Sequence, residues 1–275
     1  MSATPDHPAT PDRTEHRLQL PRDTDPADVL AMIRNVRPDA QADADGVIDL
    51  GDDARLIPDT SRRGGGRFTL EVPRQRDEPT QLTIGDPRGY GRAFPDGEPM
   101  GAEREALDLA WALGRRLYGA VVTDSGTRLE PHPFCERDLT VVSPHALAPE
   151  SFAELIAPLA PEAELDEIPE DVSRAGYSVT VPLETGDELA VRVGRADQHS
   201  ALAQVDWLRD AVDYQIVHLP VDEGEGGIEM PDAATSERWQ VAYQRVGLIA
   251  GLLTETVGGY VLDAGGFLVD PADLA

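Results

Sequence analysis

One segment of the chain occurs twice, and this repeat constrains the fold more than any other feature of the sequence. Residues 109–131 align without a gap on residues 249–271, at an offset of 140 residues. Six positions are identical in the two copies, namely Ala110 and Ala250, Leu113 and Leu253, Gly119 and Gly259, Val121 and Val261, Gly126 and Gly266, Pro131 and Pro271. Each copy has the pattern of a helix, a glycine, an apolar run and a turn, so we expect two related structural units.

A second pair of segments matches nearer the N-terminus. Residues 25–40 align on residues 148–163 at an offset of 123. Both segments have proline near the start and at the end, with an isoleucine between them: Pro26 and Pro149, Ile33 and Ile156, Pro38 and Pro161. Their apolar residues recur at helical spacing, and proline is typical of the first turn and of the stop, so each segment predicts a helix.

Strand-like runs lie between these helices. Residues 68–73 align on 177–182, and residues 82–85 on 191–194, at an offset of 109. Alternating apolar residues and β-branched content predict strands, and shorter apolar runs predict two more, at 18–20 and 139–142. Alternation also predicts that one face of each sheet is polar, because Thr69 and Glu71, like Ser178 and Thr180, would point away from the core.

The predicted order in each unit is strand, helix, strand, strand, helix, strand. This order indicates an α+β fold, a tandem duplication of a ferredoxin-like (split βαβ) unit whose four-stranded antiparallel sheet carries both helices on one face. We expect a disordered leader at residues 1–16, a first unit at 17–132 and a second unit at 139–275. Gly119 and Gly259 are expected as the left-handed residues that end a helix.

The two units differ in two places. The first has a longer link at residues 41–66. The second has an insertion around residues 197–228, which predicts an added helix near 201–212 and an added strand near 214–219. Insertions are positions where function can diverge without disturbing a core, so the insertion is one predicted binding region.

The charge of the chain excludes some partners. The formal net charge is −27, and all 24 basic residues are arginine. Residues 139–275 hold 25 acidic residues and 6 arginines, so this half is the more acidic. Such a charge opposes binding to nucleic acid or to anionic membranes and suits a basic protein partner. The single cysteine, Cys135, and the lack of a signal or spanning segment favour a cytoplasmic location.

One local basic cluster stands out in this acidic chain. Its members are Arg62, Arg63, Arg67, Arg74 and Arg76. Guanidinium groups and the backbone amides of the glycine-rich stretch at 64–66 could hold a phosphate or carboxylate, so these arginines are the candidate binding residues.

Two other motifs carry weaker signals. Residues 41–52 resemble a calcium loop in the spacing of Asp43, Asp45 and Asp52, but Gln41 occupies the place of the first aspartate, so a solvated acidic loop is favoured over a calcium site. His132 and Cys135 are close enough in sequence for a base and a thiol, but the segment is expected to be a linker. We therefore expect no catalytic residues, no metal and no cofactor.

Three functions are compatible with these features. The first is a non-enzymatic protein-interaction or adaptor protein, which binds through the segment at 61–76 and the insertion at 201–227. The second is a small-ligand-binding protein or enzyme with a cleft between the two units. The third is an acidic inhibitor or immunity-type protein that neutralises a basic target.

Overall fold

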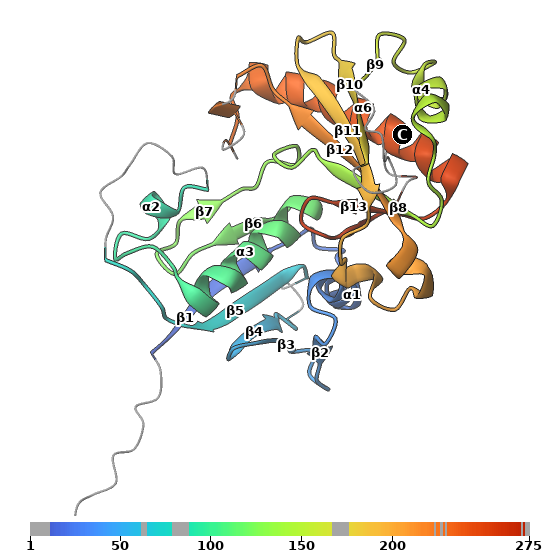
Figure 1. Cartoon of the computed structure of the whole chain (residues 1–275). Helices are drawn as coiled ribbons and strands as arrows, with labels where there is room; N and C mark the ends of the chain where they lie inside the picture. The colour runs from blue at the N-terminus through green and yellow to red at the C-terminus, as the bar shows by residue number, and fades with distance from the viewer. Residues whose placement is uncertain are drawn as a thin grey trace, which may run out of the picture. The chain divides into compact units, whose positions relative to one another are not determined.

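A computed structural model describes residues 12–61, 65–78, 88–166, 176–222, 224–225, 228, 230–270 and 272 (Figure 1). The chain divides into two compact units, one made of Met1–Leu30 and Ala40–Pro131, the other of Ala31–Asp39 and His132–Ala275. The described part is an α+β structure with two seven-stranded antiparallel sheets and five α-helices. None of these helices combines the length and the apolar content needed to cross a membrane.

The first sheet has the strand order β2-β3-β4-β5-β1-β6-β7. Its half of the chain contains, in order, β1 (Arg13–Gln19), α1 (Pro26–Val36), β2 (Gln41–Ala42), β3 (Ile48–Gly51), β4 (Ala54–Pro58), β5 (Arg67–Pro73), α2 (Tyr90–Ala93), α3 (Gly101–Arg116), β6 (Ala120–Val122) and β7 (Arg128–Leu129). Strand β1 is therefore an interior strand, between β5 and β6.

The second sheet has the order β14-β13-β8-β12-β11-β10-β9. Its elements are β8 (Leu139–Ser143), α4 (Pro149–Ile156), β9 (Glu164–Leu165), β10 (Tyr177–Pro182), β11 (Glu188–Arg195), the 3-10 helices η1 (Ser200–Leu202) and η2 (Asp206–Asp210), β12 (Val212–Leu219), α6 (Ala233–Val257), β13 (Tyr260–Asp263) and β14 (Leu268–Val269). Strand β8 lies between β12 and β13.

The core of the first unit forms where α3 packs against β1, β4, β5 and β6. Alternate residues of β5, Phe68, Leu70 and Val72, are buried, as the sequence pattern predicts. From α3, Leu107 and Trp111 are buried at helical spacing. Burying this apolar stripe is what stabilises a helix on a sheet.

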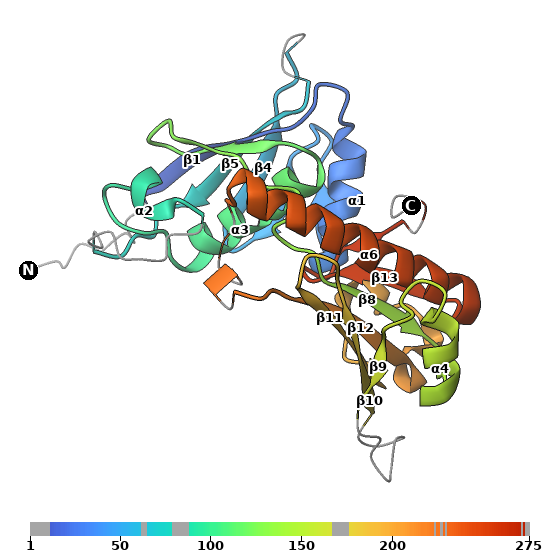
Figure 2. The same ribbon diagram turned by 90° about the horizontal axis from the view of Figure 1, so that it is seen from above.

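In the second unit, α4 and α6 contribute to one core cluster. Phe152 and Ile156 of α4 meet Ala250 and Leu253 of α6 in this cluster, together with inward residues of β8, β10, β11 and β12. Figure 2 shows α4 beside β9 and β10, with the long α6 crossing the same unit. A smaller cluster of Val142, Leu202, Ala211 and Leu262 joins the η1–η2 segment to the sheet.

The structure corrects the strand count. Each sheet has seven strands instead of the predicted four, and the expected link at 41–66 contains β2, β3 and β4. The strand predicted near 214–219 as an addition to the second unit is part of β12. This strand lies inside the sheet, between β8 and β11. The helix expected near 201–212 is replaced by η1 and η2. Residues 82–85, predicted as a strand, lie outside the described residues.

The alignment at an offset of 109 is wrong as a structural equivalence. Strand β5 contains residues 68–73 and pairs with the central β1, whereas β10 contains residues 177–182 and pairs with β11 and the short β9. The two runs share a local strand pattern but occupy different places in their sheets.

The start of β1 and the end of α3 also differ from the prediction. Strand β1 begins at Arg13, inside the segment expected to be disordered through residue 16, while residues 1–11 lie outside the described residues. At the end of α3, the left-handed residue is Tyr118, with φ of 52°, and not Gly119. A Cβ on Gly119 would lie 2.5 Å from the carbonyl oxygen of Gln19, so this glycine is required by the close approach of β1.

Candidate functional site

The second sheet has a buried face and a face that is open over β10, β11 and β12. In β10, Val179 and Val181 are buried in the core, whereas Ser178 and Thr180 point to the opposite side. Because side chains alternate along each strand, β11 and β12 continue this pattern. The open face carries the polar residues Ser178, Thr180, Arg192 and Gln215, and the register adds Ala190 and Val217 to it.

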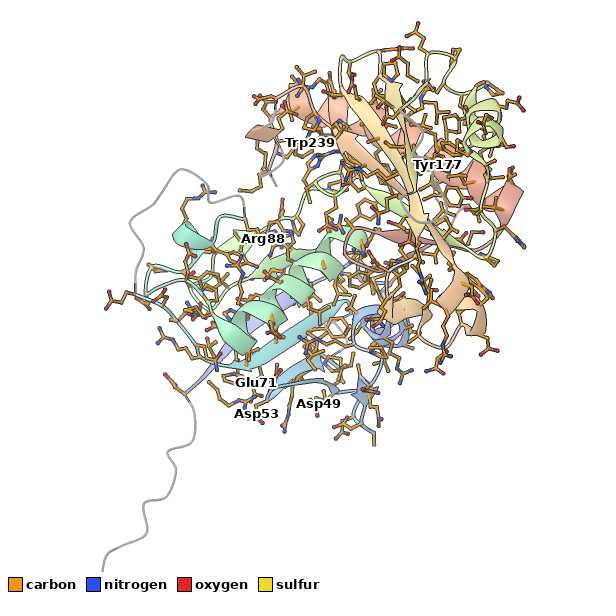
Figure 3. The ribbon with its side chains drawn as sticks, in the orientation of Figure 1. Asp49, Asp53, Glu71, Arg88, Tyr177 and Trp239 are labelled. Atoms are coloured by element: carbon orange, nitrogen blue, oxygen red, sulfur yellow. The ribbon has the colours of Figure 1, made fainter. Side chains whose placement is uncertain are left out.

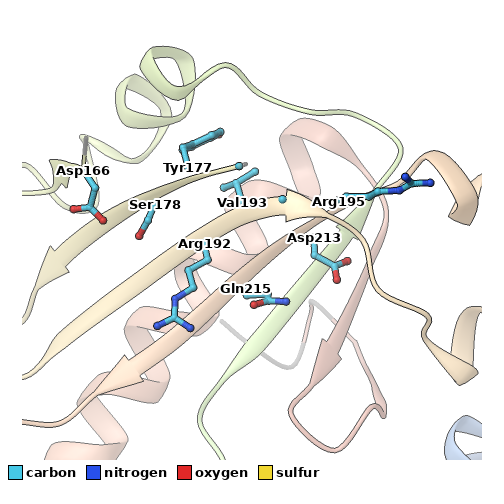
Figure 4. Close-up of a pocket in the computed structure, with 10 residues that line it drawn as sticks. Asp166, Tyr177, Ser178, Arg192, Val193, Arg195, Asp213 and Gln215 are labelled. Carbon is cyan, nitrogen blue, oxygen red and sulfur yellow. The ribbon is translucent and has the colours of Figure 1, made fainter. Parts of the chain in front are cut away.

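A recess of about 430 Å³ lies on this open face (Figure 4). Strand register places Ser178 opposite Arg192, and Arg192 opposite Gln215. Figure 4 shows these three side chains on one side of the sheet, with Asp166 near Ser178. We call this cavity the Gly194 recess, after the glycine in its floor. It presents a hydroxyl, a guanidinium, an amide and a carboxylate next to one another.

Two further cavities adjoin the Gly194 recess. One has a volume of about 320 Å³ and shares Tyr177, Gly194 and Arg195 with it. The other, about 1010 Å³, lies against the η1–η2 segment and shares Arg195. Arg209 lines both of the adjoining cavities. Arginine residues thus line three neighbouring cavities at one end of β11.

Arg192 is exposed, and its guanidinium makes no hydrogen bond or ion pair with another residue that the structure describes. Burial raises the pKa of Asp138, and Arg192 is one of the cations that oppose this rise. Among the described residues, the one hydrogen bond of the Arg195 side chain is a long contact, 3.5 Å from Nη2 to the carbonyl oxygen of Arg209. The donors of Arg192 are therefore available to a ligand.

Gly194 forms the floor between these arginines. It pairs with Asp213 in the sheet, and a Cβ built on it would meet no described atom within 4 Å. Its φ lies outside the left-handed region, so no backbone conformation requires glycine here. Glycine inside a strand weakens it and often marks a place where a ligand or another backbone comes close.

Asp213 forms a fixed wall of the recess. Its carboxylate accepts hydrogen bonds from the backbone N–H of Asp197, at 3.1 Å, and from Nε2 of His199, at 2.9 Å. Only 2% of the Asp213 side chain is exposed. These contacts direct the Asp213 carboxylate toward the η1–η2 segment. Asp213 therefore does not form an ion pair with Arg192.

The first unit buries a polar cluster around His16. The N–H of Asp124 donates to His16 Nδ1 at 3.1 Å, so Nε2 carries the proton and donates to Glu103 Oε1, also at 3.1 Å. Arg76 donates to both Glu103 oxygens and lies 4.4 Å from the ring centre of Phe94. Burial would raise the pKa of Glu103, but hydrogen bonds from His16, Arg76 and Gln75 lower it overall. This cluster is internally satisfied.

The second unit buries another cluster around His218. Arg137 Nε donates to His218 Nδ1 at 2.9 Å, and His218 Nε2 lies 3.2 Å from Asp187 Oδ2. Arg137 also stacks 3.9 Å from the ring centre of Trp239, labelled in Figure 3. Burial and the charge of Arg137 lower the pKa of His218. The lone pair of this imidazole is held by an arginine, so the ring has no free base to offer a substrate.

The linker holds a third histidine with a hydroxyl partner. The N–H of Phe134 donates to His132 Nδ1 at 3.2 Å, so His132 Nε2 carries the proton and lies 3.0 Å from Ser236 Oγ. A general base would need its lone pair on the nitrogen that faces the serine. Burial and Arg137 also lower the pKa of His132. Both ring nitrogens thus face groups other than the thiol of Cys135.

Of the predicted arginine cluster, the structure describes Arg67, Arg74 and Arg76, which lie at different ends of β5. Arg67 is exposed at the start of β5, whereas Arg74 and Arg76 follow its end, about 20 Å away at 3.3 Å per residue. Arg74 pairs with Asp96 at 3.5 Å, and Arg76 belongs to the His16 cluster. Arg62 and Arg63 lie outside the described residues, so their proposed role stays a prediction.

The acidic loop is part of a hairpin. Oδ1 of Asp43 accepts hydrogen bonds from the N–H groups of Asp45 and Val47, each at 2.9 Å, in the turn between β2 and β3. Asp49 of β3, labelled in Figure 3, caps the N–H of Gly51. Among the described residues, no group of three or more His, Cys, Asp or Glu side chains is arranged to hold a metal ion.

No known protein family, curated protein or solved structure matches the chain. Its function is therefore inferred from the geometry of the described residues.

Sequence reasoning missed the Gly194 recess. The segment at 188–195, which forms β11, contains the signal: Val191 and Val193 point inward, and Arg192 and Gly194 alternate with them on the outer face. A lone arginine beside a glycine on a polar strand face looks like ordinary surface until the register brings Ser178 and Gln215 next to it.

Proposed function

We propose that this protein is a non-enzymatic binding protein and that it holds a partner protein against the Gly194 recess. One observation carries the proposal: the recess combines an exposed arginine, whose guanidinium makes no hydrogen bond or ion pair with a described residue, with a glycine at which a Cβ would meet no described atom. Exposed polar groups that are held in place by a rigid sheet, and left unpaired, are suited to recognition.

The histidine clusters support binding over catalysis. In His16, His132 and His218, one ring nitrogen accepts a hydrogen bond from an N–H of the protein. A neutral imidazole whose lone pair is already engaged cannot take a proton from a substrate in that arrangement. These clusters therefore favour a role in stability.

We also propose that the two units descend from a duplicated split βαβ unit. Strand pairing supports the offsets of 123 and 140: Leu18 pairs with Val121, and Val141, which is 123 residues after Leu18, pairs with Val261, which is 140 residues after Val121. The central strands β4-β5-β1-β6 and β11-β12-β8-β13 have the same order relative to their helices. In this equivalence β5 corresponds to β12.

A second candidate function uses the same recess. Its volume of about 430 Å³ lies within the range of small-ligand pockets, which favours binding of a small polar molecule as the alternative. The acidic-inhibitor hypothesis rests on the net charge of −27 alone and stays a prediction.

Site-specific photo-crosslinking tests the proposal. We would replace Gln215, in the recess, with a photoreactive phenylalanine analogue and irradiate the protein in an extract of the cells that make it. The matched control is the same replacement at Glu188, which is exposed on β11 but lies outside the recess.

The expected result is one protein adduct that forms from position 215 and is absent from position 188. Its yield should fall when the unlabelled protein is added as a competitor and should not fall when the competitor carries Arg192→Gln. Equal adducts at both positions, or none at position 215, would contradict partner binding at the recess.

A further inference from the structure

We infer that the Gly194 recess binds a carboxylate group, which in the proposed function is an acidic side chain of the partner. The inference rests on the proposed site and adds the chemical class of its ligand. It is specific to the outer face of β10, β11 and β12.

The distribution of arginine is the first argument. Residues 139–275 contain only 6 arginines against 25 acidic residues. Three of the six, Arg192, Arg195 and Arg209, line the Gly194 recess or the cavities that adjoin it. In an acidic half-chain, this local gathering of guanidinium groups creates a place where a negative group is less strongly repelled than elsewhere.

The donors in the recess fit a carboxylate. Arg192 presents a planar fork of N–H groups, and the register places the Ser178 hydroxyl and the Gln215 amide beside it on adjacent strands. Carboxylates accept paired hydrogen bonds from a guanidinium and further ones from hydroxyl and amide donors. The recess can thus satisfy a carboxylate with charged and neutral donors together.

The acidic residues that line the recess favour a ligand with a single negative charge. Asp166 and Asp213 also line the recess. Asp213 is held by His199 and the N–H of Asp197, and Asp166 is exposed. These carboxylates repel a dianionic phosphate more than a singly charged carboxylate, because the Coulomb energy grows with the ligand charge.

Gly194 leaves room for the ligand beside the backbone of β11. A side chain at this position would point to the same face as Arg192, because two residues separate them in β11. The absence of a Cβ leaves the backbone beside Arg192 and Arg195 open to a ligand atom. No described atom would lie within 4 Å of a Cβ here, so the described residues leave this space open.

A titration followed by NMR tests the inference on the full chain. Acetate, which carries one negative charge, is the probe, with inorganic phosphate and the diamine putrescine as comparison arms at a mildly alkaline pH where phosphate is a dianion. The amide signals of Ser178, Gly194 and Gln215 are followed. We expect saturable shifts with a Kd of about 1–10 mM for acetate, as befits a small ligand held by a few polar contacts. Phosphate should bind more weakly, and putrescine should leave these signals unchanged.

Three variants give the matched comparison. Arg192→Gln should weaken acetate binding at least about fivefold, since it removes a charge-assisted pair of hydrogen bonds. Arg128→Gln removes the same charge from an exposed position in the first unit and should leave the Kd unchanged. Gly194→Val should abolish binding without lowering the melting temperature, since valine is a good strand former, while Thr180→Val on the same face should keep it.

The inference is overturned by several outcomes: no shift at Gly194, equal weakening in Arg192→Gln and Arg128→Gln, tighter binding of phosphate than of acetate, or shifts caused by putrescine. Its failure is separable from that of the proposed function. A specific adduct from position 215 with no acetate binding rejects the carboxylate alone, whereas acetate binding with no adduct rejects the protein partner and leaves a small acid as the ligand.

Discussion

Among single residues, Tyr118 is held in a conformation that its side chain disfavours. It ends α3 with φ of 52°, and the next residue, Gly119, donates its N–H to the carbonyl of Gly114, which closes the helix with a left-handed residue. The Tyr118 side chain is 80% exposed, so its packing contributes little to offset the strain. A left-handed position of this kind favours glycine.

Tyr118→Gly should therefore stabilise the protein. We expect the free energy of unfolding to rise by about 1 kcal/mol, measured by denaturant titration. Tyr118→Phe keeps the backbone strain and serves as the control, with a change within about 0.5 kcal/mol. A gain in the control equal to that in the glycine variant would show that the strain is not the cause.

Gly259, in contrast to Tyr118, is a position where adding a side chain should destabilise the protein. Its φ is 109°, and a Cβ there would lie 2.0 Å from the carbonyl oxygen of Val142 in β8. Gly259→Ala should cost at least about 3 kcal/mol, because the strand and the helix end cannot both keep their places. Gly251→Ala in α6, where a Cβ meets no described atom within 4 Å, should instead gain up to about 1 kcal/mol.

The same denaturant titration distinguishes the two alanine variants. Equal effects at positions 251 and 259 would contradict the account, since the difference rests only on what the added methyl group meets.

Between elements, the His218 cluster joins β12, the start of β8 and α6, and it makes stability depend on pH. Burial and Arg137 lower the pKa of His218, while an unfolded histidine titrates near 6.5. As the pH falls below this value, the unfolded state gains protons that the folded state does not, so the contribution to stability present above pH 6.5 is lost.

The free energy of unfolding should therefore decrease between about pH 7 and pH 5. His218→Gln should flatten this decrease, and the part that persists should reflect His132, whose pKa burial and Arg137 also lower. Urea titrations at a series of pH values measure the slope. An unchanged slope in His218→Gln would reject the assignment.

The strands differ in how far the sequence could predict them. Runs with strong alternation, such as β5 and β10, were predicted as strands because their pattern is local. The strands β3 and β4 were missed because four or five residues with Asp and Gly between them resemble a loop. Partner choice was missed for a different reason: which strand lies beside β1 depends on contacts between residues far apart in the chain.

The candidate site could not be predicted from the sequence, because it also depends on which strands pair. Arg192 and Gly194 are visible in one strand, but Ser178 and Gln215 come from two others, and the cavity exists only once the register is known. Arg67 lies close to Arg74 and Arg76 in sequence, but the extended strand β5 separates them in space, which only the structure shows.

For the whole molecule, the dominant feature is the excess of 51 acidic over 24 basic residues. Carboxylates at this density repel one another in the folded state, and salt screens the repulsion. Raising NaCl from about 0.05 M to about 0.5 M should increase stability by roughly 1–2 kcal/mol, or a melting temperature higher by about 3–6 °C. Calorimetry measures the shift, and KCl should reproduce it if screening is the cause.

The increase in stability caused by salt should differ between the two halves of the chain. Residues 139–275 carry 6 arginines and 25 acids, a net charge of −19, whereas residues 1–138 carry 18 and 26, a net charge of −8. Because self-repulsion grows with the square of the charge, it is about sixfold greater in the second segment at equal size. Hydrogen exchange measured by mass spectrometry at both salt concentrations should show a larger increase in protection for peptides from β11, β12 and α6 than for peptides from β1, β5 and α3. An equal or smaller increase in the second unit would mean that its carboxylates are too well spaced, or too well paired with its few arginines, for net charge to control its stability.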